Sequence, residues 1–294
     1  MNKKVVHKFA VSEKEIGQRI DLFVAGQLCK SRSQIQRVFK DRQIIVNKKS
    51  EKANYLLKIG DTVKILANPA KAESNITIPV IYEDDYIVII DKPAGVSAHP
   101  APGEKELTIS EYFSDKLSCR KNGLKLRIVH RLDKGTSGLM ILTKKKRAEE
   151  FLREQFRKHR VKKTYYALVT GRLVPKEGII ELPLKRDLIK RERINVGESG
   201  KRAKTQYKVK NYYSDYSYLE LQPETGRTHQ LRVHLSAIGY PIVGDLRYGK
   251  KSDLTSRIFL HAARIEFFHP ETGQKISFIS KLPNELKKTI NTIN

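Results

Sequence analysis

One short stretch, residues 129–144, changes from charged to apolar within a few positions. It opens with Val129 to Asp133, continues through a loop with two glycines, and ends in the apolar run 138–143. Such a run, bounded by turn residues, is typical of a buried strand. The sequence therefore predicts a carboxylate, Asp133, on a tight loop at the mouth of a buried strand, where rigid scaffolds often carry catalytic groups. The alternative is that Asp133 and Arg131 form an ordinary surface ion pair.

Charge narrows the class of partner. The chain has 294 residues, with 58 Lys and Arg against 32 Asp and Glu, a net charge of +26. This excess repels itself unless the protein binds a polyanion, where it gains from counterion release. We find no run of about 20 apolar residues and no basic amphipathic tail that would indicate a membrane as the polyanion. Nucleic acid is therefore the expected partner. The first residues lack the apolar core of a secretion signal, and we expect a cytoplasmic protein.

Residues 1–67 form a predicted small domain. Apolar residues at helical spacing predict a helix over 16–28, and Ser31 caps a second helix that follows. Short strands are expected at 43–46 and 61–66. Basic side chains project from this helix pair: Arg19, Arg32, Arg37 and Arg42.

Two basic helices followed by short strands resemble the S4-type RNA-binding module. The resemblance is carried in order by Arg19-Ile20-Asp21, Ser31-Arg32-Ser33 and Val46-Asn47. The chain departs from that pattern at Lys48, where glycine is usual. The resemblance implies that Arg19, Arg32, Arg37 and Arg42 contact RNA; the alternative is a solvated basic helix pair.

Composition shifts at 68–79, which predicts a linker before a second domain at 80–294. In that domain strands mostly follow one another directly, so the fold class is α+β, with a mostly antiparallel mixed sheet flanked by helices. A helix predicted over 144–163 carries ten Lys and Arg against three Glu. Its outer face is expected to contact phosphates, although a solvated face is the default for such a helix.

Four motifs in the second domain occur in a fixed order. They are Lys92-Pro93-Ala94-Gly95, the stretch His130-Arg131-Leu132-Asp133 to Gly138, Lys163-Thr164-Tyr165, and Thr225-Gly226-Arg227-Thr228-His229-Gln230-Leu231-Arg232. Together they resemble the RluA-type RNA pseudouridine synthases, several of which carry an S4-type module in front. The resemblance implies a pseudouridine synthase fold and the isomerisation of uridine in RNA, with no metal, nucleotide or organic cofactor. It also implies that Asp133 is the catalytic aspartate, Tyr165 the active-site tyrosine, Arg232 the charge partner of Asp133, and Arg131 the base-displacing arginine.

These residue types suit the chemistry. A carboxylate can act as a covalent nucleophile, and a nearby cation must keep it ionised if it is buried. A guanidinium is suited because its fork binds a carboxylate bidentately. From sequence alone Arg227 is another possible partner of Asp133, but we expect it to contact phosphate.

Histidines complete the set of candidate groups. His130 is expected to stabilise its loop, and none of the remaining histidines has the spacing of a zinc site. We expect these to be structural or adjacent to RNA: His99, His229, His234 and His261.

The leading hypothesis is a monomeric synthase acting on large-subunit (23S) ribosomal RNA. The first alternative keeps the reaction and changes the substrate to transfer RNA. The second is a non-catalytic RNA-binding or ribosome-assembly protein that has kept the fold. A base-cleaving glycosidase is a third, but it would need a second acid group of comparable context, and no such pair is evident.

Overall fold

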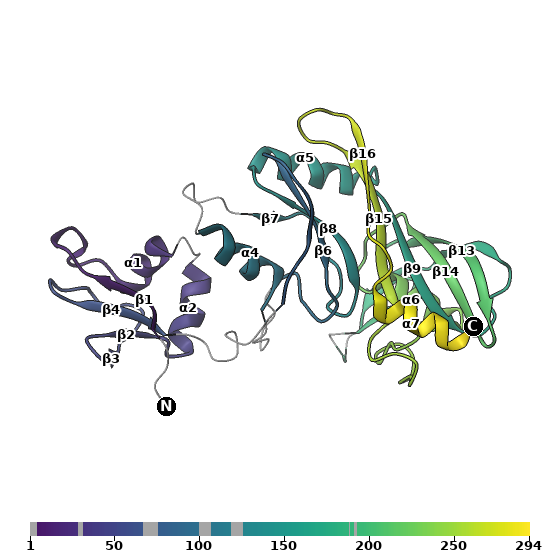
Figure 1. The fold of residues 1–294 in the computed structure, drawn as a ribbon, viewed down its shortest axis with the longest axis horizontal. Helices are drawn as coiled ribbons and strands as arrows, with labels where there is room; N and C mark the ends of the chain where they lie inside the picture. Colours follow the sequence, from purple (N-terminus) through teal and green to yellow (C-terminus); the bar gives the residue numbers. More distant parts are fainter. Residues whose placement is uncertain are drawn as a thin grey trace. The chain divides into compact units, whose positions relative to one another are not determined.

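The computed structural model describes residues 5–28, 32–66, 76–99, 107–118, 126–187, 189–190 and 193–294 (Figure 1). The chain separates into two compact units: 1–76 with 99–125, and 77–98 with 126–294. The division at 76/77 falls inside the predicted linker 68–79, most of which lies outside the described residues. The assignment of residues 1–67 and 80–294 as domains stays a prediction, and the described residues of 99–118 cluster with the first unit.

The first unit is built around a small antiparallel sheet in the order β1-β4-β2-β3. Its strands are β1 (Val5–Ala10), β2 (Ile44–Val46), β3 (Lys49–Ser50) and β4 (Thr62–Leu66). Its helices are α1 (Ile20–Gln27), α2 (Arg32–Lys40) and α4 (Ile109–Ser118). The expected helix over 16–28 starts later, because Gly17 adopts φ +73 and Ile16 is exposed. Strand β1 was not expected from the sequence.

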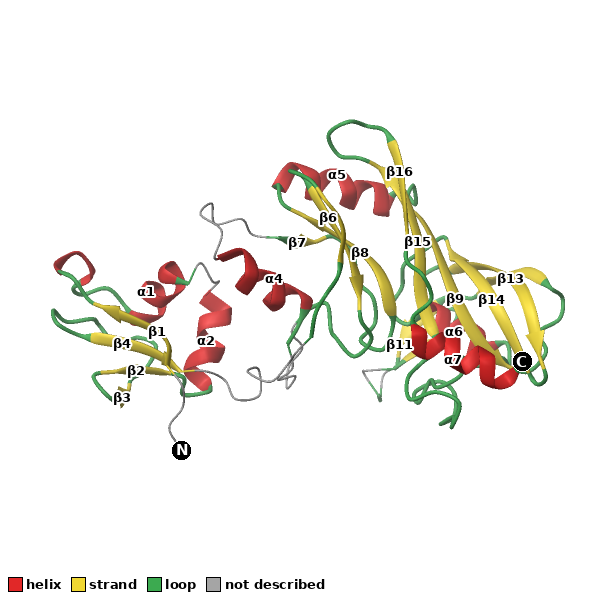
Figure 2. Ribbon diagram, in the orientation of Figure 1, coloured by secondary structure: helices red, strands yellow, loops and turns green. Residues whose placement is uncertain are grey.

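The second unit contains one large sheet in the order β10-β13-β14-β9-β15-β8-β6-β5, with β16 paired to β15 and β7 to β8 (Figure 2). Its strands are β5 (Val80–Glu83), β6 (Ile87–Lys92), β7 (Arg127–Ile128), β8 (Ser137–Thr143), β9 (Lys162–Thr170), β10 (Glu177–Glu181), β13 (Lys204–Tyr213), β14 (Tyr216–Pro223), β15 (Leu260–Phe268) and β16 (Lys275–Ile279). Strands β11 (Leu184–Arg186) and β12 (Ile194–Val196) form a separate hairpin. Among the described residues, β15 with β8 is the one parallel pairing, so the mostly antiparallel mixed sheet is confirmed.

Helices cover this sheet in two places. Helices α6 (Gln230–Ala237) and α7 (Asn284–Ile293) pack on β9 and β14 through Leu231, Leu235 and Leu286 (Figure 1). Helix α5 (Lys146–Arg157) packs Leu152 against β6, β8 and the end of β15. It is shorter than the predicted 144–163, because the chain turns at His159 and enters β9 at Lys162.

The basic face of α5 is partly neutralised by its own carboxylates. Arg153 pairs with Glu149 at 2.9 Å, and Arg157 and Lys158 both pair with Glu154, at 2.6 and 3.0 Å. The basic side chains of these pairs are exposed, so each pair contributes little to stability. The expected contact of this face with phosphates stays a prediction.

The apolar run at the end of the opening stretch is strand β8, and all seven of its residues are buried. It lies between β6 and β15, with Gly138 opposite Ala262 across the parallel seam. A Cβ at Gly138 would lie 2.3 Å from the carbonyl oxygen of Ala262, and the residue adopts φ +115. Only glycine fits there, because it has no Cβ and tolerates positive φ.

Gly138→Ala is therefore expected to lower the free energy of unfolding by roughly 3 kcal/mol or more, through backbone strain and overpacking. The matched control is Gly273→Ala, where φ is +66 but nothing lies within 4 Å of the added Cβ. It should cost about 1–2 kcal/mol. Urea unfolding of the full chain, followed by circular dichroism, measures both. Equal losses would contradict the steric account of the seam.

Candidate active site

Asp133 lies on the loop that leads into β8. Its backbone carbonyl accepts the Thr136 N–H at 3.0 Å, closing a tight turn. The next carbonyl, of Lys134, accepts the Gly95 N–H at 2.8 Å, which ties this loop to the loop after β6. Buried Leu132 anchors the preceding side. The carboxylate is thus presented from a loop whose backbone is fixed on both sides.

A fully buried lysine joins the same two loops. The Lys92 ammonium donates to the carbonyls of Pro93 at 2.9 Å, Val96 at 2.8 Å and Lys134 at 3.2 Å. Three carbonyls match its three N–H donors. Burial lowers the pKa of Lys92 to about 7, although Asp133 acts in the opposite direction. Lys92 belongs to one of the sequence motifs, but the motif alone offers no reason for its position there. The structure shows the reason: Lys92 holds the loop of Asp133 in place.

Arg257 supports the loop from the other side. Its Nη2 donates to Ser137 Oγ at 2.9 Å and lies 3.2 Å from Glu285 of α7, while its Nη1 donates to the Gly135 carbonyl at 3.3 Å. Ser137 Oγ also meets His261 Nδ1 at 2.9 Å. Arg257 lies outside the four motifs.

The ion pair expected between Asp133 and Arg232 is present: Nη1 of Arg232 lies 3.2 Å from Asp133 Oδ2. The expectation that the guanidinium fork binds Asp133 bidentately is wrong. The fork is occupied by Asp245, which accepts from Nε at 2.7 Å and from Nη2 at 2.8 Å. Arg227 points elsewhere, donating from Nε to the Arg202 carbonyl at 3.1 Å.

Asp245 is a functional residue that the sequence motifs did not reveal. Its side chain is fully enclosed, and Oδ1 also accepts the backbone N–H groups of Arg247 at 2.9 Å and Tyr248 at 3.2 Å. Burial raises the pKa of this carboxyl, but Arg232 and the two N–H groups outweigh that effect and hold it below its usual value. The sequence held only an indirect sign that Arg232 has a second partner. A buried guanidinium has five N–H donors, and one bond to Asp133 leaves most of them unsatisfied.

The motif 225–232 folds as a loop entering α6, and Gln230 organises it. Its side-chain oxygen accepts from Thr225 Oγ1 at 2.6 Å and from the Arg227 N–H at 3.0 Å, while its amide donates to Thr205 Oγ1 at 3.0 Å. His229 precedes the helix with φ 55, a left-handed conformation. Helix α6 begins only at Gln230, whose side chain holds 225–227 as a loop.

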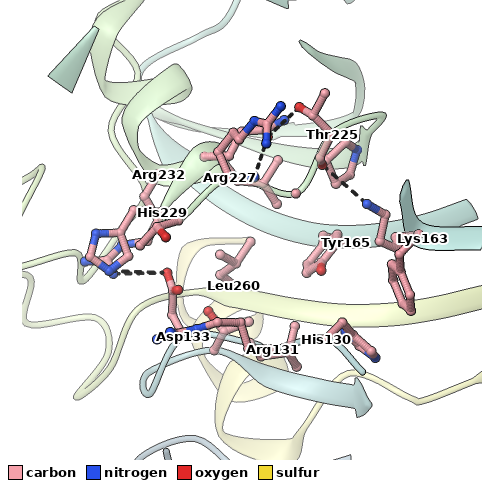
Figure 3. A pocket seen from close by; sticks show the side chains of 18 of the residues that line it. His130, Arg131, Asp133, Lys163, Tyr165, Thr225, Arg227, His229, Arg232 and Leu260 are labelled. Atoms are coloured by element: carbon pink, nitrogen blue, oxygen red, sulfur yellow. Dashed lines mark hydrogen bonds and ion pairs between the residues drawn. The ribbon is translucent and has the colours of Figure 1, made fainter. Parts of the chain in front are cut away.

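These segments enclose a cavity of about 510 Å³. In Figure 3, Tyr165 and Leu260 lie between the loop bearing Arg131 and Asp133 and the segment from Thr225 to Arg232. Burial, and secondarily Asp133, raises the pKa of the Tyr165 phenol, so it stays protonated at neutral pH. Arg131, which is exposed, is among the lining residues. The lining also includes Leu132, Thr136, Phe156, Lys163, Arg227, His229 and Leu231.

His130 and Lys163 occupy one end of the cavity. His130 Nε2 accepts the Ile141 N–H at 2.9 Å and its ring stacks on Phe156, so it stabilises the loop as expected. Burial, with Lys163 nearby, lowers the pKa of His130 to about 3. Lys163 donates to the Thr225 carbonyl at 3.3 Å, and burial lowers its pKa to about 8. It was not singled out for a role.

The other histidines have protein partners. His234 bonds Thr205 Oγ1 and the Leu182 carbonyl, both at 3.0 Å. His99 meets Ser110 Oγ at 3.1 Å in the first unit. Across the described ranges no three His, Cys, Asp or Glu side chains are grouped as metal ligands would be, and none of the helices there is long and apolar enough to cross a membrane.

Two arginines of the first unit lie beside the buried carboxylate of Asp21. Arg19 donates from Nε at 3.1 Å and from Nη2 at 2.9 Å to Asp21, and Arg32 lies 3.4 Å from the same group. Arg42 adopts φ 50 and lines an open hollow with Lys40. The side chain of Arg37 lies outside the described residues.

Residues 86–237 match the RNA pseudouridylate synthase family. The chain belongs to this family. It is 36% identical to the uncharacterized RNA pseudouridine synthase YlyB of Bacillus subtilis, over 96% of each chain. It is 37% identical to the ribosomal large subunit pseudouridine synthase C of Buchnera aphidicola, again over 96% of each. The structure of human RNA pseudouridylate synthase domain containing 4 is similar, with a TM-score of 0.60 and 26% identity over 73% of this chain and 92% of that one.

Membership of this family makes the protein a pseudouridine synthase, an isomerase that acts on RNA. The matched span includes β6 to α6 and therefore Asp133, Tyr165 and Arg232. Asp245 lies just beyond it. The predicted family and reaction are confirmed.

Asp245→Asn should lower the free energy of unfolding by roughly 2–4 kcal/mol, because an amide cannot balance the charge of a guanidinium that is largely buried. The matched control is Glu181→Gln, which neutralises the partner of Arg202 in an exposed pair of 2.9 Å. That change should cost less than about 1 kcal/mol. Urea unfolding compares the two, and equal effects would contradict the assigned role of Asp245.

Proposed function

We propose that the protein isomerises specific uridines to pseudouridine in large-subunit ribosomal RNA, with Asp133 as the catalytic carboxylate. The observation that carries this proposal is a carboxylate paired with Arg232 that opens, with Tyr165, on one cavity of about 510 Å³. The RNA target follows relatives named ribosomal large subunit pseudouridine synthase C, from Buchnera aphidicola and Salmonella typhimurium, at 37% and 34% identity.

The reaction detaches uracil from ribose, turns the base and rejoins it through a different ring carbon. Asp133 supplies the anion beside the glycosidic bond, as carboxylates do at other sugar centres. Arg232 pairs with the Asp133 carboxylate at 3.2 Å and so holds it at the cavity. Isomerisation transfers no electrons to an acceptor and consumes no second substrate, so the proposed mechanism uses no cofactor.

Tyr165 serves as the platform for the detached uracil. Aromatic rings stack on bases of any sequence, and this ring lies in the cavity beside Leu260 (Figure 3). The raised pKa keeps the phenol protonated, so it is suited to hydrogen bonding rather than to acting as a phenolate base.

Arginines bring the RNA to this cavity. A target uridine in a stacked helix must be flipped out, at a cost of a few kcal/mol, and exposed Arg131 fills the space that it leaves. Arg227 contacts phosphate at the rim. In the first unit the S4-type surface supplies Arg19, Arg32, Arg37 and Arg42. We place this activity in the cytoplasm. We also expect a monomer, since one chain carries every group that the mechanism uses.

Asp133→Asn should abolish the reaction, lowering the rate at least about 10³-fold, because an amide is neither anionic nor nucleophilic. Release of tritium from RNA labelled at C5 of uridine measures turnover, and filter binding measures RNA affinity, which should stay within about twofold. Asp253→Asn, an exposed position on the same unit, is the control and should leave the rate unchanged. Near wild-type turnover by Asp133→Asn on bound RNA would overturn the mechanism.

Ribosomal RNA is expected to be the substrate, and transfer RNA is its competitor. Pseudouridine maps of both RNAs from cells with and without this protein should differ at a few uridines of large-subunit ribosomal RNA. Purified protein added to RNA from the deficient cells should restore those sites. Loss confined to transfer RNA would refute the proposed target and leave the reaction itself intact.

A further inference from the structure

His229 has no part in the mechanism above, yet its ring faces the carboxylate on which that mechanism depends. Nε2 of His229 lies 3.9 Å from Asp133 Oδ2, the same oxygen that Arg232 approaches to 3.2 Å. The opposite ring nitrogen, Nδ1, lies 2.8 Å from the Tyr248 hydroxyl. Figure 3 shows the imidazole beside Asp133 and Arg232.

The Tyr248 hydroxyl decides which nitrogen of His229 carries the proton. That hydroxyl accepts the backbone N–H of Ile194, on β12, at 2.9 Å. Its own proton then needs an acceptor, and within the described residues His229 Nδ1 is the acceptor in reach. A neutral imidazole has one donor and one acceptor nitrogen. With Nδ1 as the acceptor of the Tyr248 proton, Nε2 carries the ring proton toward Asp133.

Charges around the ring are consistent with a neutral imidazole. Burial lowers the pKa of His229, and Arg232 and Arg247 lower it further. Asp133 and Asp245 act in the opposite direction without reversing the shift. At neutral pH the group facing Asp133 is an uncharged N–H donor.

The backbone at His229 adopts a conformation that is rare for a residue with a side chain. His229 has φ 55, in the left-handed region that costs a side-chain-bearing residue of order 1–2 kcal/mol. Its carbonyl accepts the Val233 N–H at 2.9 Å, so the strained residue is also the start of α6. Such outliers gather where the surrounding structure fixes a functional side chain.

We propose that His229 is a positioning residue for Asp133, locked by Tyr248 as the tautomer that carries its proton on Nε2. With Arg232 it faces Oδ2 and leaves Oδ1 as the oxygen available to the substrate; Oδ1 accepts no hydrogen bond from the described residues. The separation of 3.9 Å shortens to a hydrogen bond once RNA fills the cavity, as such contacts tighten in substrate complexes. This role rests on the proposed function of Asp133.

The tautomer is measured first, without reference to activity. Nitrogen-15 chemical shifts of the imidazole, assigned with His229→Gln, should show a protonated Nε2 and an unprotonated Nδ1 at pH 7. Tyr248→Phe keeps the ring and removes the hydroxyl, so it should give a mixture of both tautomers. The matched control is Tyr212→Phe, which removes a phenol that donates to the Leu173 carbonyl at 2.7 Å, and should leave the shifts unchanged. A proton on Nδ1 in the wild-type protein would overturn the proposal.

Turnover then tests the consequence. His229→Leu should lower kcat about 10- to 100-fold, the value of a hydrogen bond to a charged group, with KM changed less than about twofold. His229→Gln retains an N–H donor and should recover most of that loss. Full activity of His229→Leu, or a loss entirely in KM, would refute the role. Activity of Asp133→Asn would instead refute the proposed function, and the tautomer measurement would still stand.

Discussion

The site depends on the ion pairs of Arg232, because this side chain binds two carboxylates from separate loops at once. Taking three charges out of water is costly unless each is paired and hydrogen-bonded. Asp245 meets this requirement with the bidentate contact and two backbone N–H groups. Arg232 also lies over the Tyr248 ring, 5.1 Å from its centroid. The remaining arm of the guanidinium is then fixed on Asp133, and helix α6 cannot turn without breaking both ion pairs.

Two further buried cations hold the backbone on which Asp133 sits. Lys92 binds the Lys134 carbonyl, and Arg257 binds the Gly135 carbonyl. Neither cation makes a hydrogen bond to the Asp133 carboxylate itself; both bind carbonyl dipoles of its loop. Because these bonds fix the loop before substrate arrives, the carboxylate is already positioned for the reaction. The hydrogen bonds that fix the loop and the ion pair of its carboxylate therefore come from different residues.

The sequence predicted what short-range patterns encode. Buried strand β8, the charged loop before it and the antiparallel sheet follow from apolar runs and turn residues, and Asp133 with Arg232 came from motifs. Asp245 could not be found in this way, since its partner is 13 positions away across a helix end and a glycine-rich loop. The roles of Tyr248 and Arg257 were not predicted for the same reason. Each acts through a contact with residues distant in the sequence, which no local periodicity indicates. Gln230, at the start of α6, also bonds Thr205, a residue of β13 that lies 25 positions earlier in the chain.

Motif membership and chemical role are therefore separate properties in this protein. In the motif 225–232, Gln230 bonds Thr225, Thr205 and the Arg227 N–H, and Arg232 binds Asp245 through Nε and Nη2. These two side chains thus hold other parts of the site in place. The tautomer of His229 is set from further away still, by an N–H group of β12 acting through Tyr248. Any aspartate could supply the negative charge of Asp133. What distinguishes this site is that residues far apart in the chain determine which carboxylate oxygen of Asp133 is free.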